Sequence, residues 1–194
     1  MNAARTGALI LGLCLVMTGH AAARDDAYAA VREELELCVA CHGEGGASSQ
    51  PEFPILAGQH LYYLYVQLED FKSGYRKNDE MGPIAAELDK AEMLMIAEYF
   101  SEQIWPRIGF RADPAIALKG ETAAAAGQCV QCHRGGYEGD SRVPRLAGQH
   151  RAYLNQTMLD FKHKVRNNSP AKSTLMTSFG DADIAAMADF LAGF

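Results

Sequence analysis

Two cysteine pairs, each followed directly by a histidine, carry the most specific chemistry in the chain. They are Cys38-Val39-Ala40-Cys41-His42 and Cys129-Val130-Gln131-Cys132-His133. Two thiols with two residues between them span the two vinyl groups of a porphyrin, to which they bind as thioethers, and the next histidine then points at the iron. A zinc site made from both pairs, or a dithiol redox centre, needs no histidine after each pair. The sequence therefore predicts two covalently bound haem c groups, attached at Cys38, Cys41, Cys129 and Cys132, with His42 and His133 as iron ligands.

The ligand on the other side of each iron decides whether that iron carries electrons or binds a substrate. A methionine there keeps the iron six-coordinate and raises its reduction potential. Met81 and Met176 lie in loops on the C-terminal side of the two motifs, and we predict that they are these ligands. An open site, or ligation by His60 and His150, which both follow Ala-Gly-Gln, is the alternative. The simpler interpretation of these two histidines is a helix start beside the haem pocket.

The chain repeats itself around these residues. Leu-Ala-Gly-Gln-His occurs at 56–60 and at 146–150, and Asp-Phe-Lys occurs at 70–72 and at 160–162, a constant offset of 90 residues. Such a match is typical of a tandem duplication. Two prolines and a glycine interrupt the helical pattern at the joint. We therefore predict one domain over residues 24–105, a linker over 106–114 and a second domain over 115–194.

Within each copy the apolar residues have helical spacing, and no strand pattern stands out. Helices expected over 28–38 and 121–129 lead into the haem motifs. The second helix of the first copy can end at Gly74. The last helix begins at Asp89, where Glu92 completes a capping box, and its counterpart begins near Asp181. Each copy, at roughly 80 residues, is small for a self-sufficient core, so a haem is expected to complete it.

Residues 1–23 have the features of a secretory signal peptide. Arg5 supplies the positive charge, residues 8–17 the apolar segment, and Ala21-Ala22-Ala23 the small residues before cleavage. Cleavage removes Cys14, so the four remaining cysteines all belong to the haem motifs. The sequence therefore predicts a periplasmic protein, and it is compatible with peripheral membrane association.

The formal net charge of the chain is −6 at pH 7. Binding to phosphates needs a basic face, so this balance argues against a nucleic-acid partner. Basic residues of the first copy are echoed by basic residues in the same region of the second copy. They either balance haem propionates, dock an acidic partner or face solvent; they are Lys72, Arg76, Lys77, Lys162, Lys164 and Arg166.

Taken together, these features resemble the dihaem cytochromes of the cytochrome c4 family. The resemblance covers the predicted mature chain and rests on both haem motifs, the two repeated segments, and residues 76–78 and 166–168 ahead of a methionine. It implies an all-α fold of two tandem class I cytochrome c domains related by a pseudo-twofold axis. It also implies His/Met ligation of both irons, by His42, Met81, His133 and Met176. Extra residues around 169–173 depart from the family pattern next to Met176.

The resemblance implies an electron carrier and not an enzyme. Its partners would be donor and acceptor oxidoreductases, with a terminal oxidase or a sulfur-compound dehydrogenase among the candidates. A permanent cytochrome subunit of a sulfide or thiosulfate dehydrogenase has a similar two-haem layout and is the nearest alternative. A dihaem peroxidase would need one iron with a displaceable ligand and acid–base groups beside it, and such enzymes are generally much longer.

Overall fold

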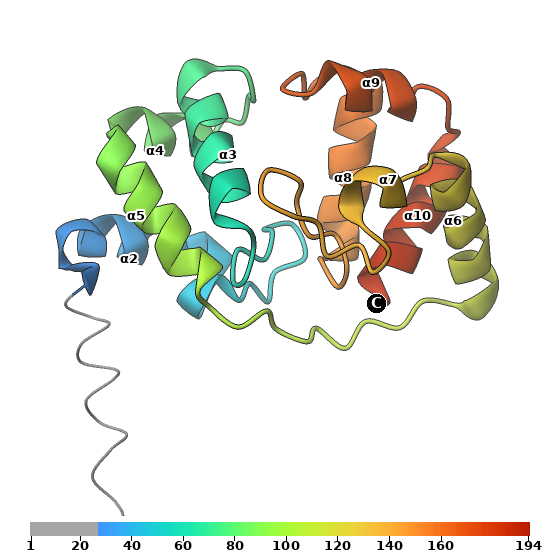
Figure 1. Cartoon of the computed structure of the whole chain (residues 1–194), viewed down its shortest axis with the longest axis horizontal. Coiled ribbons are helices and arrows are strands. Elements are labelled where there is room, and N and C mark those ends of the chain that lie inside the picture. The colour runs from blue at the N-terminus through green and yellow to red at the C-terminus, as the bar shows by residue number, and fades with distance from the viewer. Residues whose placement is uncertain (1–26) are drawn as a thin grey trace, which may run out of the picture.

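The computed structural model describes residues 27–194, and its regular structure is helical (Figure 1). The predicted signal peptide and Cys14 lie outside these residues. Within the described range the β pairings are two isolated bridges, Arg76 with Arg166 and Asp140 with Val143. The all-α prediction is therefore confirmed.

The first half of the molecule, residues 27–105, follows the predicted helices closely. Gly74 ends the second helix in the left-handed conformation, with φ 77°. Asp89 Oδ1 accepts a hydrogen bond from the Glu92 N–H, and the Glu92 carboxylate accepts one from the Asp89 N–H, which completes the predicted capping box. The elements are η1 (Ala29–Val31), α2 (Arg32–His42), η2 (Glu44–Gly46), α3 (Leu61–Ser73), α4 (Met81–Glu87) and α5 (Lys90–Ser101).

The second half, residues 114–194, differs from prediction at its first helix. This helix begins at Pro114, the last residue of the predicted linker, because Asp113 Oδ1 accepts from the Ala115 N–H and caps it. Gln128 has φ 52° and interrupts the helix, so the second haem motif ends on a separate short helix. The elements are α6 (Pro114–Ala126), α7 (Val130–His133), α8 (Arg151–Lys162), α9 (Pro170–Met176) and α10 (Asp181–Ala192).

The loops expected around Met81 and Met176 contain short helices instead. Met81 is the first residue of α4, where Asn78 Oδ1 accepts from the Met81 N–H at 2.7 Å. Met176 is the last residue of α9, which begins at Pro170. The extra residues of the second copy therefore build α9 ahead of its methionine, whereas in the first copy α4 follows the methionine.

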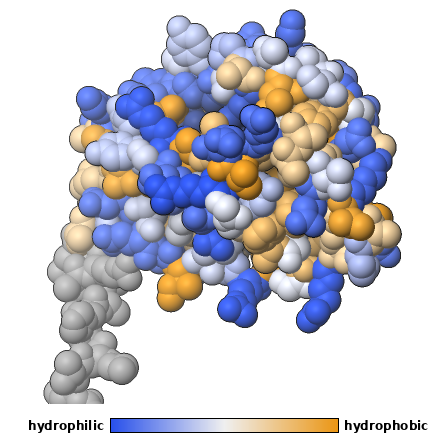
Figure 2. Space-filling model, turned by 45° about the vertical axis from the view of Figure 1, so that its right-hand side comes forward, coloured by the Kyte–Doolittle hydropathy of each residue, from blue (hydrophilic) through white to orange (hydrophobic). Residues whose placement is uncertain are grey.

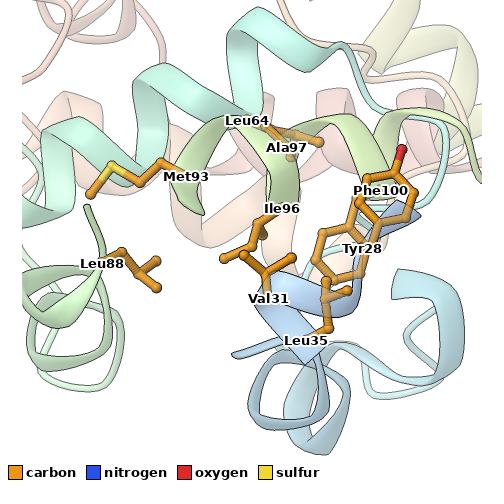
Figure 3. Close-up of a cluster of buried hydrophobic side chains, with 9 residues drawn as sticks. All are labelled: Tyr28, Val31, Leu35, Leu64, Leu88, Met93, Ile96, Ala97 and Phe100. Carbon is orange, nitrogen blue, oxygen red and sulfur yellow. The ribbon is translucent and has the colours of Figure 1, made fainter. Parts of the chain in front are cut away.

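Each half has its own apolar core. In the first half Val31, Leu64 and Phe100 meet between η1, α3 and α5 (Figure 3). In the second half Ile184 and Leu191 of α10 pack with residues of α6 and α8. The main helix-to-helix contacts stay within a half: α3 with α4 and α5, α10 with α6 and α8, and α8 with α9. The two halves are therefore joined by loops and polar side chains.

A pseudo-twofold axis relates the halves, and α3 and α8 flank the middle of the molecule (Figure 1). Arg76 forms its bridge with Arg166, its counterpart in the repeat. A residue that pairs with its own counterpart lies close to the axis that exchanges the two copies. This confirms the predicted tandem arrangement.

Gly120 is expected to be essential where α6 crosses α10. A Cβ at this position would overlap the backbone carbonyl of Ala186 and would lie 2.7 Å from the Cβ of Phe190. Because neither atom can move without its helix, Gly120→Val should lower the free energy of unfolding by about 1–3 kcal/mol. Guanidinium unfolding followed by circular dichroism measures this. Gly135→Ala, which would meet no atom within 4 Å, is the control, and equal stability of the two variants would contradict the crossing.

Candidate haem sites

The two motif histidines are held in the same way. His42 ends α2 with its Nδ1 3.0 Å from the carbonyl oxygen of Pro54, and His133 ends α7 with its Nδ1 2.9 Å from that of Pro144. A carbonyl oxygen only accepts, so each Nδ1 carries the proton. Each Nε2 is therefore left with a free lone pair, which is the tautomer that binds a metal.

Both imidazoles are neutral at pH 7. Burial lowers the pKa of His42, and the hydrogen bond to Pro54 opposes this shift without cancelling it. In the same way, burial lowers the pKa of His133 to about 4. Neutral imidazole is the form that ligates metals.

The residue after each histidine turns the chain out of its helix. Gly43 has φ 75° and Arg134 has φ 65°, and both lie in the left-handed region. At Gly43 a Cβ would come within 3.0 Å of the Ala47 carbonyl oxygen, so this turn is tight as well as left-handed. The turn sends each loop back past the histidine, where the proline carbonyl can accept the Nδ1 proton.

No disulfide joins the four motif cysteines to one another or to other described residues. Burial raises the pKa of Cys38 to about 11, and it also raises the pKa of Cys129. A dithiol redox centre depends on a thiol with a lowered pKa, which is the opposite shift. In residues 27–194 no group of three or more cysteine, histidine, aspartate or glutamate side chains is arranged to hold a metal ion, and the two cysteine pairs lie in different halves. The geometry therefore supports neither the dithiol nor the zinc alternative.

Each predicted distal methionine is carried by a short helix of its own half. Met176 is buried, and Met81 is half-buried. Helix α4 contacts α3, and α9 contacts α8. The two methionines thus have equivalent supports, although one stands at the start of its helix and the other at the end.

His60 and His150 serve the interface between the halves. They stand directly before α3 and α8, as the helix-start interpretation predicts. His60 Nε2 donates to the carbonyl oxygen of Glu138, and His150 Nε2 donates to that of Ser48, each at 2.8 Å. Both acceptors belong to the opposite half. Each Nε2 carries a proton in this hydrogen bond, so it has no free lone pair with which to bind iron.

Sequence reasoning missed the glutamines that precede these histidines. Gln149 Oε1 accepts from the Ile55 N–H and its Nε2 donates to the Ile55 carbonyl, both at 3.0 Å. Gln59 forms the equivalent pair with Arg145, at 2.9 and 3.1 Å. Each glutamine amide thus bonds both the backbone N–H and the backbone carbonyl of one residue in the opposite half, as a neighbouring β-strand would. The one available signal was the repetition of Gln-His in both copies.

Two arginines near the pseudo-twofold axis form a cluster with excess positive charge. Arg166 is only 5% exposed, and its guanidinium and that of Arg76 both donate to Gln67 Oε1, at 2.6 and 3.0 Å. Among the described residues neither arginine has an ion pair with a carboxylate. Burial by itself raises the pKa of the Tyr153 hydroxyl, but the positive charges of Arg76 and Arg166 outweigh it and lower that pKa. Buried cations need nearby anions, and haem propionates are such anions, so this cluster fits a bound haem.

Comparison with known proteins identifies the family. A family model for cytochrome c matches residues 117–193. Cytochrome c4 of Thiocapsa roseopersicina is 36% identical over 90% of this chain and 97% of its own length. The chain belongs to the cytochrome c4 family. The crystal structure of reduced recombinant cytochrome c4 from Pseudomonas stutzeri agrees, with a TM-score of 0.76 at 32% identity over 88% of this chain and 97% of that one.

A thiosulfate dehydrogenase electron acceptor of Thiomonas intermedia is also similar, at 31% identity over 85% of this chain and 82% of its own. Membership confirms the predicted fold of two class I cytochrome c halves and the two covalently bound haem c groups. The chain is an electron-transfer cytochrome, and its partners are redox proteins.

Loss of one haem is expected to unfold one half. Cys38→Ala with Cys41→Ala prevents thioether formation in the first half, whereas the second half keeps its own core and its own haem. Because a half of roughly 80 residues buries too little apolar surface alone, limited proteolysis should remove the first half, and helical circular dichroism should fall by about half. Cys129→Ala with Cys132→Ala is the matched variant, with the reverse outcome. Full helicity and full protease resistance in both would show that haem is not needed for folding.

Proposed function

We propose that this cytochrome is a periplasmic carrier that passes electrons between redox proteins, with His42 and Met81 on one iron and His133 and Met176 on the other. The observation that carries the proposal is the repeated arrangement. Each half holds a neutral histidine with a free Nε2 and a methionine on a short packed helix. Haem iron supplies the one-electron couple, and a thioether on the distal side favours the ferrous state.

Side chains of this protein would hold the iron ligands in fixed orientations. The Nδ1–H hydrogen bonds fix the plane of each imidazole. A methionine on each distal side would leave no position for a substrate, and the set of ligands from this chain would stay the same in both oxidation states. Arg76 and Arg166 would supply positive charge to haem propionates. Their Cζ atoms lie 4.5 and 4.6 Å from the ring centroids of Phe71 and Phe161, which hold the two guanidinium groups in place. Of the earlier interpretations of the repeated basic residues, charge balance is the one that suits these two.

The proposed electron carrier needs no catalytic residue of its own. A haem peroxidase needs an open iron site with an acid–base group beside it. The histidines with equivalent positions in both halves, His60 and His150, donate instead to backbone carbonyls across the interface. We therefore assign no catalytic residue.

The proposed compartment rests on the predicted signal peptide at residues 1–23. Across residues 27–194 no helix is long and apolar enough to cross a membrane. Thioether attachment outside the cytoplasm suits this compartment. Peripheral contact with a membrane is compatible with it.

Exposed apolar side chains suit brief contact with protein partners. Val130, inside the second haem motif, is 40% exposed, and Val165 is 58% exposed. Figure 2 shows apolar residues gathered in the right half of the view. The similarity to a thiosulfate dehydrogenase electron acceptor favours a sulfur-compound dehydrogenase as one donor. A permanent subunit of such a complex is the second candidate, and co-purification at fixed stoichiometry would favour it over a free carrier.

Replacement of Met176 tests the proposed ligand where the two copies differ most. Met176→Ala should open the iron, so that a high-spin signal appears and carbon monoxide binds at one haem only. Met176→His should keep that iron low-spin and lower its potential, because imidazole donates more strongly than a thioether. In both variants the ferric absorption band that reports sulfur on iron should fall by about half, as expected for two similar sites.

Met158, half-buried beside the core of the second half, provides the matched control. Met158→Leu should leave the band and the spin state unchanged. If Met176→Ala kept the full band and stayed closed to carbon monoxide, another residue would be the ligand.

A further inference from the structure

The hydrogen bond that orients each motif histidine ends on a peptide group that the opposite half also holds. The Pro54 carbonyl, which accepts from His42 Nδ1–H, and the Ile55 N–H belong to one peptide unit. Gln149 Oε1 accepts from that N–H at 3.0 Å. Gln149 lies in the second half. Its side chain is therefore linked through a single peptide unit to the motif histidine of the first half.

The same chain of hydrogen bonds exists in the other direction. His133 Nδ1–H donates to the Pro144 carbonyl at 2.9 Å, and Gln59 Oε1 of the first half accepts from the Arg145 N–H of the same peptide unit at 2.9 Å. Two independent copies of one arrangement, with nearly equal distances, argue that the link is a feature of the fold.

The hydrogen bonds between Gln149 and Ile55 are buried, and those of the equivalent link and of the two motif histidines are partly buried. Gln149 is 3% exposed, Gln59 is 4% exposed, and Ile55 is 1% exposed. In such surroundings hydrogen bonds in a chain polarise one another. An acceptor on the peptide N–H makes the carbonyl of that peptide a better acceptor, which draws the Nδ1 proton further from the imidazole. The Nε2 lone pair then becomes a stronger donor to a metal.

We propose that each glutamine tunes the iron of the opposite half: Gln149 acts through His42, and Gln59 acts through His133. The inference rests on the proposed function, in which these histidines are iron ligands. Stronger donation by imidazole stabilises ferric iron. Each glutamine therefore lowers the reduction potential of the haem in the opposite half, and docking of the halves is coupled to both potentials.

A glutamine that merely joins the halves predicts something different. Loosening the interface would change the exposure of both haems, so both potentials would move together. Tuning through the peptide unit moves only one potential, and that potential belongs to the haem in the half that does not contain the substituted residue. The identity of the haem that responds thus separates the two roles.

The test is Gln149→Leu in the holoprotein, with redox titration resolved for each haem. The potential of the haem attached at Cys38 and Cys41 should rise, while that of the haem attached at Cys129 and Cys132 stays unchanged. Replacing the hydrogen-bond partner of a metal ligand changes metal affinity or activity by about ten- to hundredfold, and Gln149 is one step further from the metal. We therefore expect a change of up to about tenfold in the ferric-to-ferrous equilibrium, or about 59 mV for one electron.

Gln59→Leu should give the reverse assignment. Gln156→Leu is the matched control, because Gln156 is exposed on α8 and bonds only Asp160 of its own helix among the contacts seen, at 2.7 Å. A second measurement reads the hydrogen bond directly. In the reduced Gln149→Leu protein, the proton NMR signal of His42 Nδ1–H should move upfield, as for a weaker hydrogen bond, and that of His133 should not.

Three results with Gln149→Leu would overturn the tuning role. The potentials of both haems could shift equally, or only the potential of the haem in the second half could shift. The third such result is no change in either the potentials or the Nδ1–H signal. The ferric sulfur-to-iron band of the unmutated protein tests the proposed function separately. If that band is present at full strength and Gln149→Leu has no effect, only the tuning role fails.

Discussion

The hydrogen bond from each motif histidine to a proline carbonyl is the interaction on which the haem sites depend. It fixes the tautomer, holds the ring and leaves Nε2 free, with Nδ1 to oxygen distances of 3.0 and 2.9 Å in the two halves. The bond requires a helix that ends on the histidine, a left-handed residue directly after it, and a loop that returns to the ring. All three conditions occur twice in the chain, once in each half.

The second constraint is the polar interface. The main helix contacts stay within each half, so the relative orientation of the halves rests on buried and partly buried side-chain hydrogen bonds. A buried polar group that loses its partner costs about 1–3 kcal/mol, and each glutamine satisfies both the N–H and the carbonyl of one residue. Near the pseudo-twofold axis the two arginines add a positive charge that only an anionic group can balance.

Local sequence signals predicted the local features correctly. The left-handed end of α3 at Gly74 and the capping box at Asp89 each depend on residues close together in the sequence. Helices α4 and α9 were missed because seven residues offer too few periodic positions to stand out from a loop. The partners of Gln59 and Gln149 were missed for another reason. Their hydrogen bonds join residues 86 and 94 positions apart, and only the folded interface brings these together.

In the proposed function, each iron has its distal position closed by a methionine side chain of its own half. Adding carbon monoxide to the reduced, unmutated protein at neutral pH tests this most directly, because carbon monoxide binds ferrous haem wherever the distal position is open or its ligand is easily displaced. We predict no change in the Soret spectrum of either haem. Binding at one or both haems would contradict the account, and it would favour a ligand-binding or catalytic haem over an electron carrier.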